Sequence, residues 1–242
     1  MASKSETGHT KNISNFETVI SICTGYGPAY NPSNVNISIA ELITLHIIAA
    51  NSGNVVKTTE ANFNDIEGQR MIVFKPLKPL STRVFAALKG SQPPVTVIAD
   101  AKTINMKIQG KRANNIIKKL LLDETEERRI SVSQQSYDLQ IEHFDKFIDL
   151  VAIEPKYNPN ENDLKVTALN TFKSEMISSN INVKNAYVPY SNALIARNHI
   201  LYNDEEGLVA RAALVKDYVK SVFGANSSEF KQINKIAFKS FY

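Results

Sequence analysis

The sequence has few of the residues that mark specialised protein classes. It contains no Trp, one Cys, 9 Gly and 9 Pro in 242 residues. The single Cys23 excludes a disulfide scaffold, and the low Gly and Pro content excludes a collagen-like chain. No run reaches the ~18 consecutive apolar residues of a membrane-spanning helix. Hydrophobic residues make up 43% of the chain, which is enough to form a core and argues against disorder.

Charge and the N-terminal segment bear on partners and compartment. The net charge of +4 is too small to indicate nucleic-acid binding, and acidic residues are mixed among the basic ones. The first 15 residues show no basic segment followed by an apolar one, so no standard signal peptide is expected. One unpaired cysteine suits a reducing compartment. We expect a cytoplasmic protein, with export without a cleavable leader as the alternative.

Two parts of the chain match each other at an offset of about 127 residues. Tyr30-Asn31-Pro32 and Tyr157-Asn158-Pro159 each precede a long helical pattern, and a short amphipathic stretch lies before each motif, at 16–20 and 144–148. Downstream, apolar positions and one arginine recur at the same offset: Leu42, Leu45, Val56, Phe63, Arg70 and Phe74 against Leu169, Phe172, Val183, Tyr190, Arg197 and Leu201. We interpret the match as an internal duplication.

The hydrophobic spacing is that of helices. Apolar residues recur every three or four positions from Leu169 to Leu201, which indicates a packed helix. Pro189 lies inside this run, so a kink or break is expected near 185–188. In the first half, a helix is expected from about Ser33 to Phe74. Further helices are expected over 95–122 and 131–153, and no segment shows the sustained two-residue alternation of a strand.

These patterns predict an all-α fold, an elongated helical bundle built from two similar multi-helix repeats. A helix of ~40 residues would be ~60 Å long. The expected boundaries are a flexible N-terminus over 1–14, a first repeat over 15–122, a charged turn and the start of a connecting helix over 123–142, and a second repeat over 143–242. The two repeats are expected to form one continuous bundle.

Several local stretches resemble an uncharacterised family of bacterial hypothetical proteins of similar length. The resemblance covers nearly the whole chain, and these segments carry it: Cys23-Thr24-Gly25-Tyr26-Gly27, Tyr30-Asn31-Pro32, Phe74-Lys75-Pro76-Leu77, Ser133-Gln134-Gln135-Ser136-Tyr137-Asp138, Leu164-Lys165-Val166-Thr167-Ala168-Leu169, Ala196-Arg197-Asn198 and Phe223-Gly224-Ala225. The resemblance implies no activity, cofactor or catalytic residue.

The sequence lacks the common catalytic and metal-binding motifs. It contains no HExxH, CxxC, GxSxG or phosphate-binding loop motif. Glu142 and His143 are adjacent and therefore point about 100° apart on a helix, which is unsuitable for joint metal ligation. Cys23 follows a short apolar helix pattern and is expected to be a buried, unreactive thiol. We expect no metal, no cofactor and no catalytic residue.

Arg70 and Arg197 are the most informative polar residues, because each continues an apolar seam at the same place in its repeat. A buried guanidinium must be paired, since removing it from water costs several kcal/mol. Glu67 lies one turn before Arg70, whereas the counterpart of Glu67 is Leu194. We expect a polar contact that sets helix register or an arginine whose stem is packed. The alternative is a site for a small anion that uses Arg70 and Arg197.

An acidic stripe follows one helix at spacings of four, three and four: Asp138, Glu142, Asp145 and Asp149. Two interpretations are a cation site and a docking strip for a basic partner. The third is a solvated face, with lysines of the preceding segment alongside, namely Lys107, Lys111, Lys118 and Lys119. Such exposed pairs contribute ~0–1 kcal/mol each.

Two segments bear on membrane contact. The most apolar patch, 37–50, contains Glu41, Thr44 and His46 and is interpreted as a buried core helix. The C-terminal stretch 230–242 is predicted to be a basic amphipathic helix that packs in the bundle.

The sequence therefore favours a non-enzymatic structural or protein–protein interaction protein that self-associates. The alternatives are a membrane-active, pore-forming-like helical protein and a small-anion-binding bundle. A protein partner or self-association is expected, and nucleic-acid binding is not.

Overall fold

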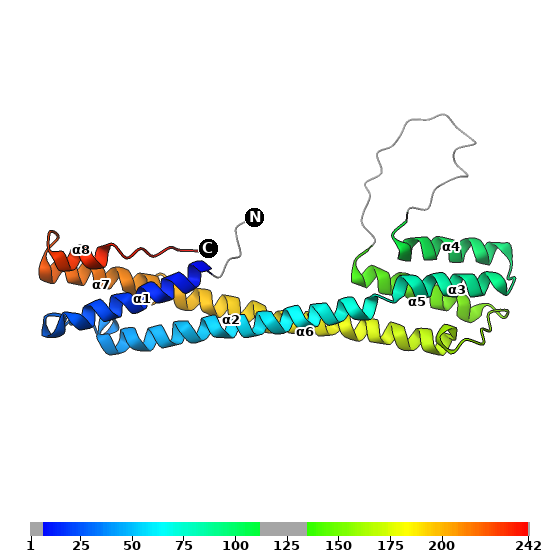
Figure 1. Cartoon of the computed structure of the whole chain (residues 1–242), viewed down its shortest axis with the longest axis horizontal. Helices are drawn as coiled ribbons and strands as arrows, with labels where there is room; N and C mark the ends of the chain where they lie inside the picture. Colours follow the sequence, from blue (N-terminus) through cyan, green and yellow to red (C-terminus); the bar gives the residue numbers. More distant parts are fainter. Residues whose placement is uncertain (1–6, 112–134, 242) are drawn as a thin grey trace, which may run out of the picture. The chain divides into compact units, whose positions relative to one another are not determined.

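The structure is a computed structural model that describes residues 7–111 and 135–241. Within these ranges the regular elements are helices and no strand occurs, so the predicted all-α class is confirmed. The chain runs in order through the α-helices in Figure 1. Their bounds are α1 Thr7–Gly25, α2 Ile39–Phe74, α3 Leu77–Gly90, α4 Val95–Gln109, α5 Tyr137–Ile153, α6 Val166–Tyr202, α7 Leu208–Phe223 and α8 Ser228–Asn234. Short 3-10 turns lie at Gly27–Ala29, Val35–Ile37 and Asn162–Leu164.

The chain divides into two compact units, which we call unit 1 and unit 2. Unit 1 consists of the residues up to Phe63 together with those from Ala186 onwards, and unit 2 consists of Asn64–Asn185. Since α2 and α6 each extend past one of these boundaries, both long helices contribute to both units. Each unit therefore takes residues from both predicted repeats.

The core of unit 1 joins α1 and the first half of α2 to the end of α6, α7 and α8. Phe16 and Val19 from α1 lie in one apolar cluster with Leu201, Leu208 and other buried residues of the C-terminal part. Figure 1 shows α7 running alongside α1, with α8 packed on α7. The segment after α8 is not helical, so the helix predicted over 230–242 is shorter than expected and its described part ends at Asn234.

The core of unit 2 is built from the end of α2, α3, α4, α5 and the start of α6. Phe144 and Phe147 from α5 are fully buried together with Leu77, Leu88 and Ile108. The described part of the helix predicted over 95–122 ends at Gln109, where Gly110 adopts a left-handed conformation with φ of 73°. Left-handed backbone at a helix end favours glycine. Residues 112–122 of the predicted helix lie outside the described residues. Residues 131–134 of the helix predicted over 131–153 also lie outside them.

Two buried tyrosines close the turns before the long helices in the same way. The Tyr30 hydroxyl donates to the Ile37 carbonyl over 2.7 Å, and the Tyr157 hydroxyl donates to the Leu164 carbonyl over 2.8 Å. Each acceptor closes a 3-10 turn that is followed by the first residues of α2 or α6. The YNP motifs therefore position the starts of both long helices.

The break expected near Pro189 is absent, because α6 is one helix across this residue. A proline inside a helix lacks the N–H that would bond to the carbonyl four residues earlier. Pro189 is exposed, so water can solvate the unpaired carbonyl. Val183, Ala186 and Ala193 of the same helix are buried.

Candidate functional site

Arg70 lies in a polar network within unit 2. Its Nη1 donates to Asn180 Oδ1 over 3.1 Å, and its Nη2 lies 3.2 Å from Glu67 Oε1. The guanidinium carbon lies 3.9 Å from the centre of the Tyr137 ring, a favourable cation–π distance. Asn180 is itself held by Asp138, to whose Oδ1 its amide donates over 2.6 Å. The network links α2, α5 and α6, which is the arrangement expected of a contact that sets helix register.

Arg197 lies in unit 1, and its surroundings differ from those of Arg70. The side chain is 3% exposed, and its Nε and Nη2 both donate to Asn198 Oδ1, over 3.2 and 2.8 Å. It lines a small cavity of about 140 Å³ together with residues of α1 and α2, among them His9, Gly53 and Lys57. The two arginines therefore belong to separate sites, each with its own neighbours.

The acidic stripe on α5 is paired mainly with lysines of α6 and of α5 itself. Asp145 Oδ1 lies 2.5 Å from Lys173 Nζ, and Asp138 Oδ1 lies 3.4 Å from Lys184 Nζ. Glu142 pairs within the helix with Lys146. The hydrogen bond from Lys146 lowers the pKa of Glu142, and the more distant Lys107 lowers it slightly further.

Asp149, the remaining acidic residue of the stripe, is exposed. Lys107 belongs to α4, and Lys111 lies two residues after the end of this helix. Lys118 and Lys119 lie outside the described residues. No group of three or more His, Cys, Asp or Glu side chains suited to a metal ion occurs in the described residues.

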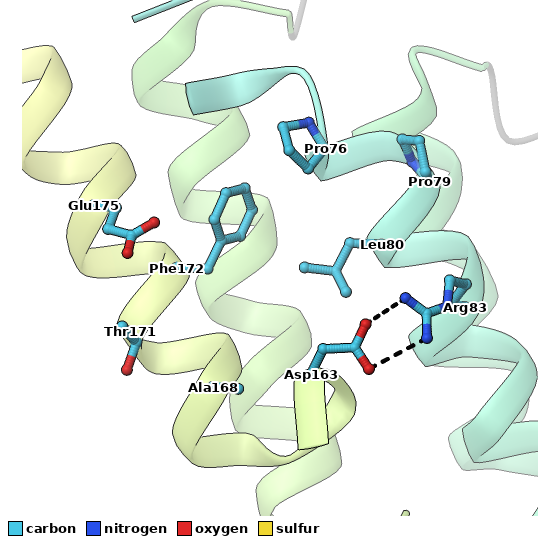
Figure 2. A pocket seen from close by; sticks show the side chains of 9 residues that line it. All are labelled: Pro76, Pro79, Leu80, Arg83, Asp163, Ala168, Thr171, Phe172 and Glu175. Carbon is cyan, nitrogen blue, oxygen red and sulfur yellow. Dashed lines mark hydrogen bonds and ion pairs between the residues drawn. The ribbon is translucent and has the colours of Figure 1, made fainter. Parts of the chain in front are cut away.

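One cavity of unit 2 was not indicated by the sequence. It measures about 530 Å³ and lies between the start of α3 and the start of α6. Figure 2 shows Leu80 and Phe172 facing into it, with Pro76 and Pro79 along one side. Its residues are far apart in the chain and ordinary in type, so no local motif could have revealed it.

A bidentate ion pair between Arg83 and Asp163 lies at the edge of this cavity (Figure 2). The Arg83 guanidinium lowers the pKa of the Asp163 carboxyl by hydrogen bonding and by charge. Both side chains are more than half exposed, and ion pairs of this kind contribute little to stability. The cavity offers apolar surface next to a charge pair, and its lining residues include no Ser, Cys, His or Lys.

Two buried groups have perturbed proton affinities without forming a catalytic arrangement. Burial raises the pKa of the Cys23 thiol to about 12, despite a hydrogen bond with Tyr30 that lowers it. The thiolate is therefore scarce at neutral pH, as expected for an unreactive cysteine. His143 is 5% exposed, its Nε2 has no hydrogen-bond partner in the described part of the chain, and burial lowers its pKa.

The exposed face of α2 in unit 1 is unusually apolar. Ile47 and Val55 are each 53% exposed, and Ile43 and Ile48 are also exposed. Among the described residues, one helical stretch, Ile39–Gly90, contains an 18-residue window long and apolar enough to cross a membrane, and 17% of that window is buried. The expectation that 37–50 forms a buried core helix therefore holds for one side of the helix only.

Comparison of the chain with family models, with curated proteins and with solved structures finds no match.

Proposed function

We propose that this is a non-enzymatic interaction protein that self-associates through the exposed side of α2 in unit 1. We call this surface the α2 apolar face, and it consists of Ala40, Ile43, Thr44, Ile47, Ile48, Asn51 and Val55, all of them exposed. The observation that carries the proposal is the exposure of four large aliphatic side chains on one helical surface. Contiguous apolar patches on soluble proteins commonly mark interaction sites.

The two sides of α2 explain why this surface is distinct. Leu42, Ala49 and Val56 are fully buried on the side that packs in unit 1. On the opposite side the helix is again apolar, and no Asp, Glu, Lys or Arg occurs from Leu42 to Val56. An amphipathic surface helix normally presents charged residues to water. The missing charges favour a second packed surface.

A second copy of the chain is the partner that this surface fits best. An uncharged apolar face can meet its own copy around a two-fold axis without like-charge repulsion. A surface that binds an anionic membrane usually carries Lys or Arg beside its apolar residues, and none lies between Leu42 and Val56. The four aliphatic side chains offer a patch of a few hundred Å² per copy, the size of functional patches on monomers.

The test is the concentration dependence of mass, measured by sedimentation velocity and light scattering, for the parent chain, Ile47→Glu and Ala213→Glu. Ala213 is exposed on α7 in the same unit and lies outside the α2 apolar face, so Ala213→Glu controls for the added charge. Burial of an isoleucine side chain contributes about 1.5–3 kcal/mol, and a two-fold contact contains Ile47 twice. We expect Ile47→Glu to weaken dimerisation at least about 100-fold and Ala213→Glu to leave it unchanged.

A parent chain that remains monomeric at all concentrations would contradict the proposal. A second measurement, flotation of the chain with neutral and anionic vesicles, tests whether it binds membranes. If the parent chain is monomeric and binds vesicles, and Ile47→Glu abolishes that binding, the membrane-active alternative replaces self-association.

We also propose that the chain arose by internal duplication and belongs to the bacterial family that it resembles. The buried residues of α1 and α5 support the duplication, because Phe16, Val19, Ile20 and Cys23 correspond in spacing to Phe144, Phe147, Ile148 and Val151. The tyrosine turns and the starts of α2 and α6 recur at the offset of about 127 residues. The first part of one repeat and the last part of the other form each unit.

A further inference from the structure

We infer that a groove beside α1 is a docking site for a short acidic segment of a partner protein, bound in an extended conformation. The groove has a volume of about 600 Å³ and lies between α1 and the segment that follows α8. Both walls belong to unit 1, and neither contains a residue of the α2 apolar face. The inference therefore goes beyond the self-association proposed above and does not depend on it.

Side chains of α1 hold the C-terminal segment against the helix. Asn12 donates to the Lys239 carbonyl over 2.7 Å and accepts from the Lys239 amide over 3.2 Å. Asn15 donates to the Ala237 carbonyl over 2.7 Å. The later residue of α1 contacts the earlier residue of the segment, so the two walls run antiparallel. Figure 1 shows the segment running back along α1 towards the start of that helix.

Apolar side chains form the floor of the groove. Ile236 and Phe241 line it and are half-buried. The Phe241 ring rests on Gly8, where a Cβ atom would collide with it. The same ring lies 5.0 Å from the ring of His9, centre to centre. These contacts fix the end of the groove next to the start of α1.

Three exposed lysines surround this floor: Lys11, Lys235 and Lys239. None of the described lining residues is acidic, and the ion pairs of the described residues include none of the three lysines. A fourth lysine nearby, Lys216, donates to the Ile236 carbonyl over 2.6 Å and so holds the segment in place. The three ammonium groups at the groove are therefore available to the carboxylates of a partner.

The spacing of the lysines restricts the ligand. The antiparallel walls place Lys11 and Lys239 towards one end of the groove and Lys235 towards the other. The α1 wall from Gly8 to Thr18 is about 15 Å long at ~1.5 Å per residue. An extended chain advances ~3.3 Å per residue, so side chains four positions apart lie about 13 Å apart and point to the same side. Two acidic residues at this spacing, with an apolar residue midway, match the groove.

Two other anionic ligands match it less well. A fatty acid is charged at one end only, and it would leave the lysines at the other end of the groove unpaired. A membrane surface is contacted by exposed apolar side chains, whereas Ile236 and Phe241 are half-buried between the two walls. A peptide segment can carry charge at both ends and apolar surface between them.

The experiment is a titration of a fluorescein-labelled peptide, with the core Glu-Ser-Leu-Ser-Glu, with the full chain, followed by fluorescence anisotropy at low ionic strength. We expect saturable binding with a Kd below about 1 mM, weakened by potassium chloride because salt screens the charges. Glu-Glu-Leu-Ser-Ser has the same composition with adjacent acidic residues and should bind at least about fivefold more weakly. In amide ¹H–¹⁵N NMR spectra, the shifts should centre on Lys11, Asn15, Ala237 and Lys239.

Three variants locate the binding. Lys11→Gln and Lys235→Gln each remove one exposed cation from opposite ends of the groove and should each raise the Kd about two- to fivefold. The double variant should raise it about tenfold. Lys231→Gln removes an exposed cation of α8 that does not line the groove, and it should leave the Kd unchanged. Far-ultraviolet circular dichroism checks that every variant is folded.

The inference is overturned if the two acidic peptides bind equally, because the attraction would then depend on charge alone. It is also overturned if Lys231→Gln weakens binding as much as Lys11→Gln does, or if the NMR shifts lie elsewhere. Absence of peptide binding, with loss of anionic-vesicle flotation or of self-association in the double variant, would assign the groove to a membrane or a second copy instead. Ile47→Glu should bind the peptide like the parent chain, so a failure of the proposed self-association can be told apart from a failure here.

Discussion

Replacing Tyr30 and Tyr157 by phenylalanine, separately, tests whether the hydrogen bonds in the two turns before the long helices contribute equally to the free energy of unfolding. Each hydroxyl donates to a backbone carbonyl seven residues later, at Ile37 or Leu164, and both hydrogen bonds are buried. The substitution removes one oxygen atom and leaves the packed ring in place. It therefore isolates the hydrogen bond from the packing of the ring.

The expected magnitude follows from the burial of the acceptor. A net hydrogen bond contributes about 0.5–1.5 kcal/mol, and a buried carbonyl left without a donor costs about 1–3 kcal/mol. We expect each substitution to lower the free energy of unfolding by about 1–2 kcal/mol. The loss should be somewhat larger for Tyr30→Phe, because the Tyr30 hydroxyl also forms a hydrogen bond with the buried Cys23.

The assay is urea unfolding followed by far-ultraviolet circular dichroism, together with thermal melting. A loss of 1 kcal/mol corresponds to a drop in Tm of about 2–4 °C for a chain of this size. Tyr187→Phe is the control, because Tyr187 is 53% exposed, and it should change stability by less than about 0.5 kcal/mol. If Tyr30→Phe is as stable as the parent while Tyr157→Phe is strongly destabilised, the equivalence of the two turns is refuted.

Three further predictions concern single positions. Leu42→Ala should cost about 2–5 kcal/mol because Leu42 is fully buried, whereas Ile43→Ala, beside it on the exposed side, should cost less than about 1 kcal/mol in the monomer, as measured by urea unfolding. Cys23 should resist a thiol reagent at pH 8 until urea unfolds the chain. Because folding raises the pKa of its thiol from 9.0 to about 12, the contribution of this group to stability is complete below pH 9 and is lost as the pH rises towards 12. Cys23→Ala should therefore make the alkaline loss of stability less steep. Pro189→Ala should raise the free energy of unfolding by about 1–3 kcal/mol, because alanine restores the missing helical N–H and has a higher helix propensity; an unchanged or lower stability would mean that Pro189 fits α6 without strain.

The sequence predicted the long helices well, because their signals are local and repeated. The expected helix from Ser33 to Phe74 corresponds to α2, which begins at Ile39 after a 3-10 turn. Spacings of three and four residues report one buried stripe. They could not report that α2 is apolar on its opposite side as well, since Ile43 and Ile47 belong to the same run of residues as the buried Leu42.

The C-terminal segment shows where local reasoning fails. Lysines at four-residue spacing predicted a helix over 230–242, yet after Asn234 the chain is held by side chains from the opposite end of the sequence. Asn12 donates to the Lys239 carbonyl over 2.7 Å and accepts from the Lys239 amide over 3.2 Å. Asn15 donates to the Ala237 carbonyl over 2.7 Å. These bonds replace helical ones, and no pattern within the segment could indicate them.

The candidate sites show the same division between local and long-range information. The pairing of Glu67 with Arg70 follows from a spacing of three residues on one helix. One interpretation of the acidic stripe placed lysines of the preceding helix beside it, whereas Asp145 and Asp138 pair with Lys173 and Lys184 of α6. The choice among lysines depends on which helix lies against α5 on its acidic side, and that is a property of the tertiary fold.

The composition of the two units bears on how the chain must fold. The core of unit 1 places Phe16 and Leu42 from the first half of the sequence against Leu201 and Val215 from the second. Neither half of the sequence carries a complete core, because each of the two buried clusters takes about half of its side chains from the second half of the sequence. The long-range contacts therefore form only when both halves of the sequence are present. Under the duplication proposed above, one molecule supplies what a single repeat would obtain only from a second copy.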